Sequence, residues 1–324
     1  MQEELLQFPN LPVIKGRGAV DNPENRFEKR KIEVDPEWLE YACERKVKTE
    51  YFVDTSQQIL AKNDSPDIPF TYSLNPYRGC EHGCIYCYAR PSHEFFGWSC
   101  GLDFETKIMV KPNAPELLER KFQSSGWQPQ MVALSGNSDC YQLIEKQMHI
   151  TRRCLEVFLK YRNPVGIVTK SDLILRDLDI LQELAKLDLV MTNVSVTTLD
   201  NRVARKMEPR ASSPLNRLTV LEKLAAAGIP AGVFVAPVIP GLTDQEMPAI
   251  LEAAARCGAK NAACILLRLP YGVKGLFQTW LQEHFPDRLN KVLHAVQDTR
   301  AGKLNDPALG FVRAEKVCAP GRFR

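Results

Sequence analysis

The sequence predicts an α/β fold built as a partial (β/α)6 TIM-like barrel, and three observations lead to this prediction. Six short, almost continuously apolar runs recur between residues 68 and 269, as is typical of parallel strands covered on both faces. Helical patterns with start and stop signals separate these runs. Six strand–helix units in succession imply parallel strands joined by right-handed crossovers. A doubly wound open sheet competes with the barrel, because six units are fewer than eight.

The apolar runs predict strands over Ile68–Leu74, Met131–Leu134, Val165–Thr169, Val190–Thr197, Ala231–Val238 and Ala262–Leu269. A helical stripe runs from Ile150 to Tyr161 and stops just before a proline. A second helix begins with Ser213 as its N-cap and ends at Gly228. Thr243 to Glu246 has the pattern of a capping box and predicts the start of a third helix.

Three regions follow from this pattern. Residues 1–66 are a polar, irregular N-terminal extension with a locally basic arm, which is either solvated or contacts phosphate. Residues 67–275 hold the barrel core, and residues 276–324 hold one amphipathic helix, around Leu289 to Val296, and a tail. The net charge of +3 is too small to indicate a nucleic-acid partner by itself.

The sequence predicts a cytoplasmic protein without a membrane span. Residues 1–20 lack a continuous apolar segment, and prolines and glycines interrupt the long uncharged stretch from Leu224 to Thr243. In a reducing compartment the ten cysteines do not form a disulfide framework. Most of them are therefore expected in the core, and the remainder need a chemical explanation.

Three cysteines follow the first predicted strand with the spacing C-x3-C-x2-C: Cys80, Cys84 and Cys87. Thiolates this close converge on one centre only if the backbone curls around it, and Gly79 and Gly83 permit the positive φ angles that such a curl needs. The carboxyl end of a strand is also where α/β proteins collect their chemistry. This loop is therefore the candidate metal site.

Two kinds of metal centre compete for this loop. A structural zinc site needs a fourth protein ligand, for which His82 and His93 are the nearby candidates. A four-cysteine iron–sulfur centre lacks its fourth thiolate, because the next cysteine, Cys100, follows at an unusual distance. A [4Fe-4S] cluster on three thiolates leaves one iron open, which is a mark of catalysis.

The three-cysteine motif, followed by an aromatic residue and placed after the first strand, resembles that of the radical SAM superfamily, within it the spore-photoproduct-lyase-like branch. Matching stretches run from Asp64 to Pro270, and Gly16-Arg17-Gly18-Ala19 is also similar to a group in this branch. The resemblance implies a [4Fe-4S] cluster that reductively cleaves S-adenosylmethionine (SAM). The resulting 5′-deoxyadenosyl radical abstracts hydrogen from a substrate, and nucleic acid is the substrate class that the branch favours.

The resemblance also implies an external one-electron reductant of the flavodoxin or ferredoxin kind. Two other functions stay open at the level of sequence. One is a nucleic-acid-binding or redox iron–sulfur protein that does not turn over SAM, and the other is a zinc-stabilised scaffold.

Several strand ends supply candidates for SAM binding. The resemblance assigns Ser138 and Asp139, in a turn exposing backbone groups, to the amino group of SAM. Lys170 needs an anionic partner, which is either the SAM carboxylate or a structural ion pair. Asn193, Ser195 and Thr197 share one face of the fourth strand, and the resemblance favours Ser195. The turn at Ile239 is suited to packing against adenine.

The remaining candidates concern radical transfer. Tyr86 and Tyr88 either shield the cluster from solvent or relay radical character. Cys140 is either a hydrogen-atom donor or a buried core thiol. Spore lyases carry a cysteine donor where this chain has Gly136, which counts against the same repair mechanism. Glu208 is a further polar residue at this end of the barrel, and it is expected either near the site or paired with Arg210.

Overall fold

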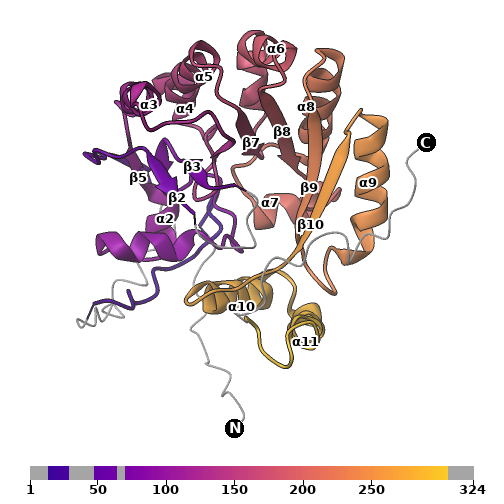
Figure 1. Cartoon of the computed structure of the whole chain (residues 1–324). Helices are drawn as coiled ribbons and strands as arrows, with labels where there is room; N and C mark the ends of the chain where they lie inside the picture. The colour runs from indigo at the N-terminus through magenta and orange to yellow at the C-terminus, as the bar shows by residue number, and fades with distance from the viewer. Residues whose placement is uncertain (1–13, 29–46, 64–69, 306–324) are drawn as a thin grey trace.

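The computed structural model describes residues 14–28, 47–63 and 70–305 (Figure 1). Its main sheet has seven strands in the order β10-β9-β8-β7-β6-β3-β2, parallel except for β2, which pairs antiparallel with β3. Their bounds are β2 Leu60–Lys62, β3 Tyr72–Leu74, β6 Val132–Leu134, β7 Val165–Thr169, β8 Val190–Ser195, β9 Ala231–Val238 and β10 Asn261–Leu266. In the described chain β10 and β2 are the two edges of this sheet, so the barrel is partial, as predicted.

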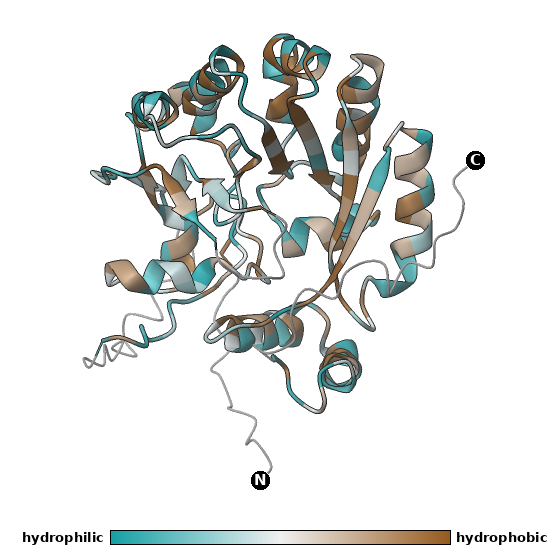
Figure 2. Cartoon of the chain, in the orientation of Figure 1, coloured by the Kyte–Doolittle hydropathy of each residue, from teal (hydrophilic) through white to brown (hydrophobic). Residues whose placement is uncertain are grey.

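Helices cover the outer side of the sheet. They are α3 Ala114–Gln123, α4 Glu145–Met148, α5 Ile150–Lys160, α6 Leu178–Lys186, α8 Pro214–Ala226 and α9 Met247–Arg256. Figure 1 shows them as an arc along the convex side of the curved sheet. In Figure 2 the central strands β7 and β9 are largely brown, whereas the helices carry both brown and teal, as amphipathic helices do. The main hydrophobic core lies between these two layers.

The two faces of the sheet differ in composition. Val165, Ile167 and Val194 point to the helices and are fully buried. On the other face, register places Val168 beside Asn193 and Asn193 beside Gly232. A Cβ atom on Gly232 would lie 2.7 Å from Asn193 Oδ1, so these residues line one surface, the inner face of the barrel. Asn193 and Ser195 share this face, as the alternation predicts.

The predicted capping is present in one helix and absent in another. Ser213 caps α8 by accepting a hydrogen bond from the Asn216 amide, and Gly228 ends this region with a positive φ of 74°. The capping box predicted before α9 is not formed. Thr243 instead accepts from the Ile239 amide, and Glu246 accepts from the amide of Leu199 and the hydroxyl of Thr198. Tertiary hydrogen bonds outcompete the local cap here, and a short 3-10 turn, η3 Asp244–Glu246, precedes the helix.

The N-terminal region is more ordered than its sequence suggests. β1 Glu50–Val53 pairs parallel with β5 Lys107–Val110, and β5 pairs antiparallel with β4 Tyr77–Arg78. Of the basic arm, Lys29, Arg30 and Lys31 lie outside the described residues. Arg17 is buried and donates to the carbonyls of Glu105 and Val47. At this position the arm is therefore packed into the protein rather than solvated.

The C-terminal part adds two helices, α10 Val273–His284 and α11 Leu289–Asp298, with η4 Pro286–Arg288 between them. α11 is the helix predicted around Leu289 to Val296, whereas α10 was not predicted. Both pack into a second hydrophobic core that also contains Ile85 and Tyr86, next to the predicted metal site. Within the described residues, no helix is both long and apolar enough to cross a membrane.

Candidate functional site

The cysteine loop follows β4 and curls back on itself. Gly79 and Gly83 have φ angles of +78° and +68°, which a residue with a Cβ atom rarely adopts. The amide of Cys87 donates to the carbonyl of Cys84 at 3.2 Å. Cys80 and Cys84 are buried, and Cys87 is partly exposed. The short loop thus gathers three thiols with one edge open to solvent.

The three thiols lie close enough to influence one another. Burial raises the pKa of Cys84 to about 12, and the neighbouring thiol of Cys87 contributes to this rise. Burial also raises the pKa of Cys80, and there both other thiols contribute. Thiols so placed favour the neutral form unless a positive centre compensates, and a bound metal centre supplies that compensation.

The geometry disfavours a mononuclear site. Among residues 14–28, 47–63 and 70–305, no three His, Cys, Asp or Glu side chains are placed to hold a single metal ion. His82 instead lies 3.4 Å from the Asp139 carboxylate, and His93 Nε2 lies 2.9 Å from the Lys107 carbonyl. The two histidines considered as a fourth zinc ligand therefore have other partners. A [4Fe-4S] cluster held by the three thiolates would need no histidine ligand, so the occupied histidines count against zinc and not against the cluster.

A buried arginine supports the cysteine loop. Arg90, in η1 Arg90–Phe96, is fully buried and forms an ion pair with Glu105, in α2 Leu102–Thr106. Its guanidinium also donates to the carbonyls of Cys84 at 2.9 Å and Gly83 at 3.3 Å. Further bonds go to the carbonyls of Cys100 and Gly101. This side chain fixes the carbonyl orientations of the cysteine loop, and no sequence motif had indicated it.

The N-terminal segment completes this support. The Glu105 carboxylate accepts hydrogen bonds from the amides of Gly18 at 3.0 Å and Ala19 at 2.9 Å. A Cβ atom on Gly18 would lie 1.9 Å from the carbonyl oxygen of Gly83, so only glycine fits this contact. The Gly16–Ala19 segment singled out in the sequence therefore packs directly against the cysteine loop.

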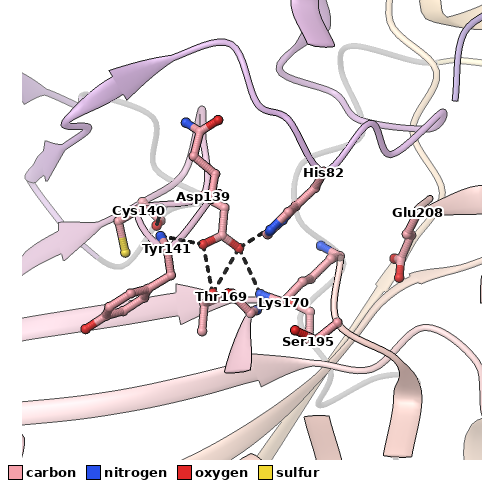
Figure 3. A network of polar contacts seen from close by, with 12 residues as sticks. His82, Asp139, Cys140, Tyr141, Thr169, Lys170, Ser195 and Glu208 are labelled. Atoms are coloured by element: carbon pink, nitrogen blue, oxygen red, sulfur yellow. Dashed lines mark hydrogen bonds and ion pairs between the residues drawn. The ribbon is translucent and has the colours of Figure 1, made fainter. Parts of the chain in front are cut away.

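Asp139 joins three parts of the site (Figure 3). Its carboxylate accepts from the Thr169 hydroxyl and from the Lys170 amide, each at 2.8 Å, and from the Tyr141 amide at 2.9 Å. His82, from the cysteine loop, lies against the same carboxylate. Asp139 thus links the turn after β6 to the end of β7 and to the loop.

Ser138 is also occupied by the protein, because its hydroxyl donates to the Tyr77 carbonyl at 2.8 Å. In the same turn Ser135 and Gly136 have φ angles of +84° and +144°. The Ser138 and Asp139 side chains, predicted to bind the amino group of SAM, thus hold the turn after β6 in shape.

The Lys170 ammonium, at the end of β7, has no ion pair within the described chain. No carboxylate of the described residues lies within 4.0 Å of the Lys170 ammonium. The structural ion pair considered for Lys170 is therefore not formed among these residues. The ammonium lies 5.9 Å from the centre of the Tyr86 ring. Burial lowers the pKa of Lys170, but the negative charges available at Cys84 and Glu208 outweigh this effect and raise it. A half-buried cation thus stands beside the cysteine loop with room for an anionic ligand.

Glu208 lies after α7 Asn201–Met207 and forms a second buried network. It accepts hydrogen bonds from the Tyr86 hydroxyl and from Thr197 at 2.9 Å, and it pairs with Arg217 of α8. Burial raises the pKa of Glu208, but Arg217 and Lys170 outweigh it and hold it below its usual value. The suggested pairing of Glu208 with Arg210 is wrong, since Arg210 lies 3.6 Å from Glu81.

The other sequence candidates fall into two groups. Ser195 and Tyr88 lie near the site: the Ser195 carbonyl accepts from Arg217 at 3.1 Å, and the Tyr88 hydroxyl donates to the Gly136 carbonyl. Ile239 is fully buried in the second core. Cys140 is fully buried in the main core, and its thiol offers no surface to a substrate. The structure thus favours the packing role considered for Cys140.

Comparison with known proteins connects this geometry to a family. The model of the radical SAM superfamily matches residues 74–254, which contain the cysteine loop and the strands from β4 to β9. The chain belongs to the radical SAM superfamily. Members of this superfamily use a [4Fe-4S] cluster and SAM, with an electron from an external donor, and these are the cofactors of this chain.

Several relatives extend the match beyond the family model. An uncharacterized protein of Mycobacterium tuberculosis is 34% identical over 245 residues, which are 73% of this chain and 72% of the relative. An uncharacterized protein of Methanocaldococcus jannaschii is 31% identical over 175 residues, 54% of this chain and 63% of the relative. Neither relative has a name that assigns a reaction.

The fold is also that of a solved radical SAM enzyme. A spore photoproduct lyase structure with bound AdoMet and dinucleoside spore photoproduct superposes with a TM-score of 0.55 at 18% sequence identity, covering 80% of this chain and 72% of the other. A second structure of this lyase gives a TM-score of 0.55 at 19% identity, covering 81% and 73%. At this level of identity the likeness concerns the fold.

Proposed function

We propose that this protein is a radical SAM enzyme whose cluster is held by Cys80, Cys84 and Cys87. The observation that carries the proposal is the pairing of these close thiols with the nearby Lys170 ammonium, which has no ion pair in the described chain. Three ligands leave one iron for SAM, and a cation beside it suits the SAM carboxylate. The proposed cluster ligands and Lys170 all lie in the barrel core predicted over residues 67–275.

The chain's own residues bind and orient SAM. Lys170 binds the carboxylate, and backbone groups of the turn at Ser135–Gly136 hold the amino group. Asp139 and Ser138 position that turn from behind, through the hydrogen bonds described above. Ser195 lies at the ribose side. Ile239, predicted to pack against adenine, is fully buried in the second core, so it supports the turn after β9 from within.

Cluster and SAM, when bound, supply a one-electron reductive cleavage whose 5′-deoxyadenosyl radical abstracts hydrogen from the substrate. The protein limits side reactions of such chemistry by excluding water from the cluster. Tyr86 contributes to this exclusion, since it is buried in the second core and its hydroxyl is held by Glu208. Tyr88 stands at the open edge of the loop, where a relay role is available to it.

Nucleic acid is the substrate class that we propose. Its support is the shared fold with spore photoproduct lyase, whose structure contains a dinucleoside spore photoproduct. The chain has Gly136 in the turn after β6, where a hydrogen-donating cysteine was expected for lesion repair. The proposed reaction therefore uses the same class of substrate without that donor.

The test is release of 5′-deoxyadenosine by anaerobically reconstituted protein with SAM and dithionite. Cys84→Ala is expected to abolish release and to lower iron and sulfide content, whereas Cys257→Ala, outside the loop, retains both. Absence of release from the wild type above the Cys84→Ala background contradicts the proposal. Bound zinc without sulfide would decide for a scaffold, and nucleic-acid binding without SAM cleavage would decide for a binding protein.

A further inference from the structure

An exposed aromatic cluster is formed by residues of the N-terminal segment, η1 and the turn before α10. Phe27, Phe95 and Tyr271 are 56%, 69% and 68% exposed. All three surround Arg26, whose guanidinium carbon lies 4.6, 5.5 and 3.9 Å from the respective ring centres. Single exposed aromatics are common, but three of them gathered around one guanidinium indicate a binding surface. We call these four residues the Arg26 platform.

The platform presents positive charge. Arg26 forms an ion pair with Glu94 at 3.1 Å, but the Glu94 side chain is only 2% exposed, whereas that of Arg26 is 26% exposed. The cation therefore faces solvent and its carboxylate partner lies beneath. Such an arrangement favours anionic ligands with flat, apolar parts.

Tyr271 has a strained backbone conformation. Its φ is +48°, a region in which asparagine or glycine is much more common than a bulky aromatic residue. Strained positions persist where surrounding contacts enforce them, and they cluster at functional sites. Here the contact is the stacking of the Tyr271 ring on Arg26.

The platform is connected to the cysteine loop through η1. Phe95 lies in η1, directly after the cysteine loop, and Tyr271 follows Arg268 by three residues. Arg90, the first residue of η1, donates to the Cys84 carbonyl at 2.9 Å, so the short helix that carries Phe95 also contacts the cysteine loop. The N-terminal segment brings Phe27 to this point as it passes α2 (indigo in Figure 1), where the Leu102 amide donates to the Asp21 carbonyl.

We propose that the Arg26 platform binds single-stranded nucleic acid by stacking its bases and thereby presents one nucleotide to the radical site. This inference rests on the proposed function and specifies its substrate as unpaired. Bases stack on aromatic rings and guanidinium planes, and the exposed cation attracts the phosphates. A duplex hides the faces of its bases, so it does not use such a surface.

The experiment uses the full-length, anaerobically reconstituted protein and a fluorescently labelled twelve-nucleotide oligothymidylate, followed by anisotropy. Phe95→Ala and Tyr271→Asn are each expected to weaken binding by about 5- to 150-fold, the range for loss of one stacked base. Asparagine tolerates the positive φ of this position, so Tyr271→Asn removes the ring without adding strain. Leu215→Ala, which removes a side chain of 72% exposure far along the chain, is the matched control and leaves affinity unchanged.

The outcomes separate this inference from the proposed function. Unchanged affinity in both platform variants, or tighter binding of a duplex of the same length than of the single strand, overturns the inference. Release of 5′-deoxyadenosine without substrate is measured in the same preparations and is expected to be unaffected by Tyr271→Asn. The wild type could bind the oligonucleotide through the platform and yet release no 5′-deoxyadenosine. In that case the proposed function fails, and the inference that the platform binds single strands is upheld.

Discussion

Two buried arginine–glutamate pairs flank the cysteine loop, and they differ in their surroundings. Arg90 and Glu105 lie on the side of the N-terminal segment, where backbone groups occupy both side chains. Arg217 and Glu208 lie on the barrel side, where their neighbours include the hydroxyl of Tyr86. The other partners of the first pair are backbone groups, whereas the second pair lies next to side chains that face the site.

This difference separates two uses of buried charge. A buried ion pair is not by itself a net source of stability, because desolvation offsets its attraction. The Arg90 pair therefore serves to fix the shape of the loop that carries the thiols. The Arg217 pair leaves a neighbouring cation, Lys170, without an ion pair in the described chain, which is the kind of incomplete pairing that a ligand completes.

The largest effect is expected from Arg90→Met. This change leaves the buried Glu105 carboxylate without its counter-ion and removes the donors to the loop carbonyls. We expect the free energy of unfolding to fall by about 3–5 kcal/mol, measured in urea under anaerobic, reducing conditions. Arg256→Met, in an exposed pair with Glu252, is the control and changes it by less than about 0.5 kcal/mol. A loss as small as the control's would mean that Arg90 does not support the loop.

A pH effect is expected on the same side of the loop. Burial lowers the pKa of His93 from 6.5 to about 4, so the unfolded chain binds a proton more readily than the folded one between these values. Stability from this group is complete above pH 6.5 and is lost as the pH falls toward 4, by about 3 kcal/mol in total. His93→Phe should remove this component, seen as a flatter dependence of unfolding free energy on pH than in the wild type. Parallel curves for the two proteins would contradict it.

A smaller effect is expected from Gly18→Ala. The added methyl group would meet the Gly83 carbonyl at 1.9 Å, so the N-terminal segment must move away from the cysteine loop. Such overpacking lowers the free energy of unfolding by about 1–3 kcal/mol, and iron retention after reconstitution should fall with it. Gly126→Ala is the matched control, because nothing lies within 4 Å of its added methyl group. Equal behaviour of the two variants would show that the contact does not matter.

The parts of the molecule that could be predicted from the sequence are those with a local signal. β7 and β9 were predicted to the residue, because nearly continuous apolar runs that begin directly after a proline specify buried parallel strands. The cysteine loop was recognisable because thiol spacing is a local signal. Ser213 was recognisable for the same reason, since an N-cap acts within three residues.

The supports of the loop had no such local signal. Arg90 and Glu105 are 15 residues apart, and Glu105 meets Gly18 across 87 positions. Glu208 and Tyr86 are separated by 122 positions. Only the fold brings such partners together. A local pattern can even mislead, as it did at Glu246, where a partner 48 positions away replaced the expected cap.

The smallest effect on stability, and the sharpest test of the site, is expected from Lys170→Met. The Lys170 ammonium has no ion pair in the described chain, and the attraction of nearby negative charge offsets its desolvation, so the free energy of unfolding should change by less than about 1 kcal/mol. SAM affinity of the reconstituted protein, measured by titration calorimetry, should fall about 10- to 150-fold, because a charged hydrogen bond is worth about 1.5–3 kcal/mol. Lys186→Met, at an exposed position, changes neither quantity. A loss of several kcal/mol in stability with unchanged SAM affinity would place Lys170 with Arg90, among the residues that hold the loop, and remove the contrast between its two sides.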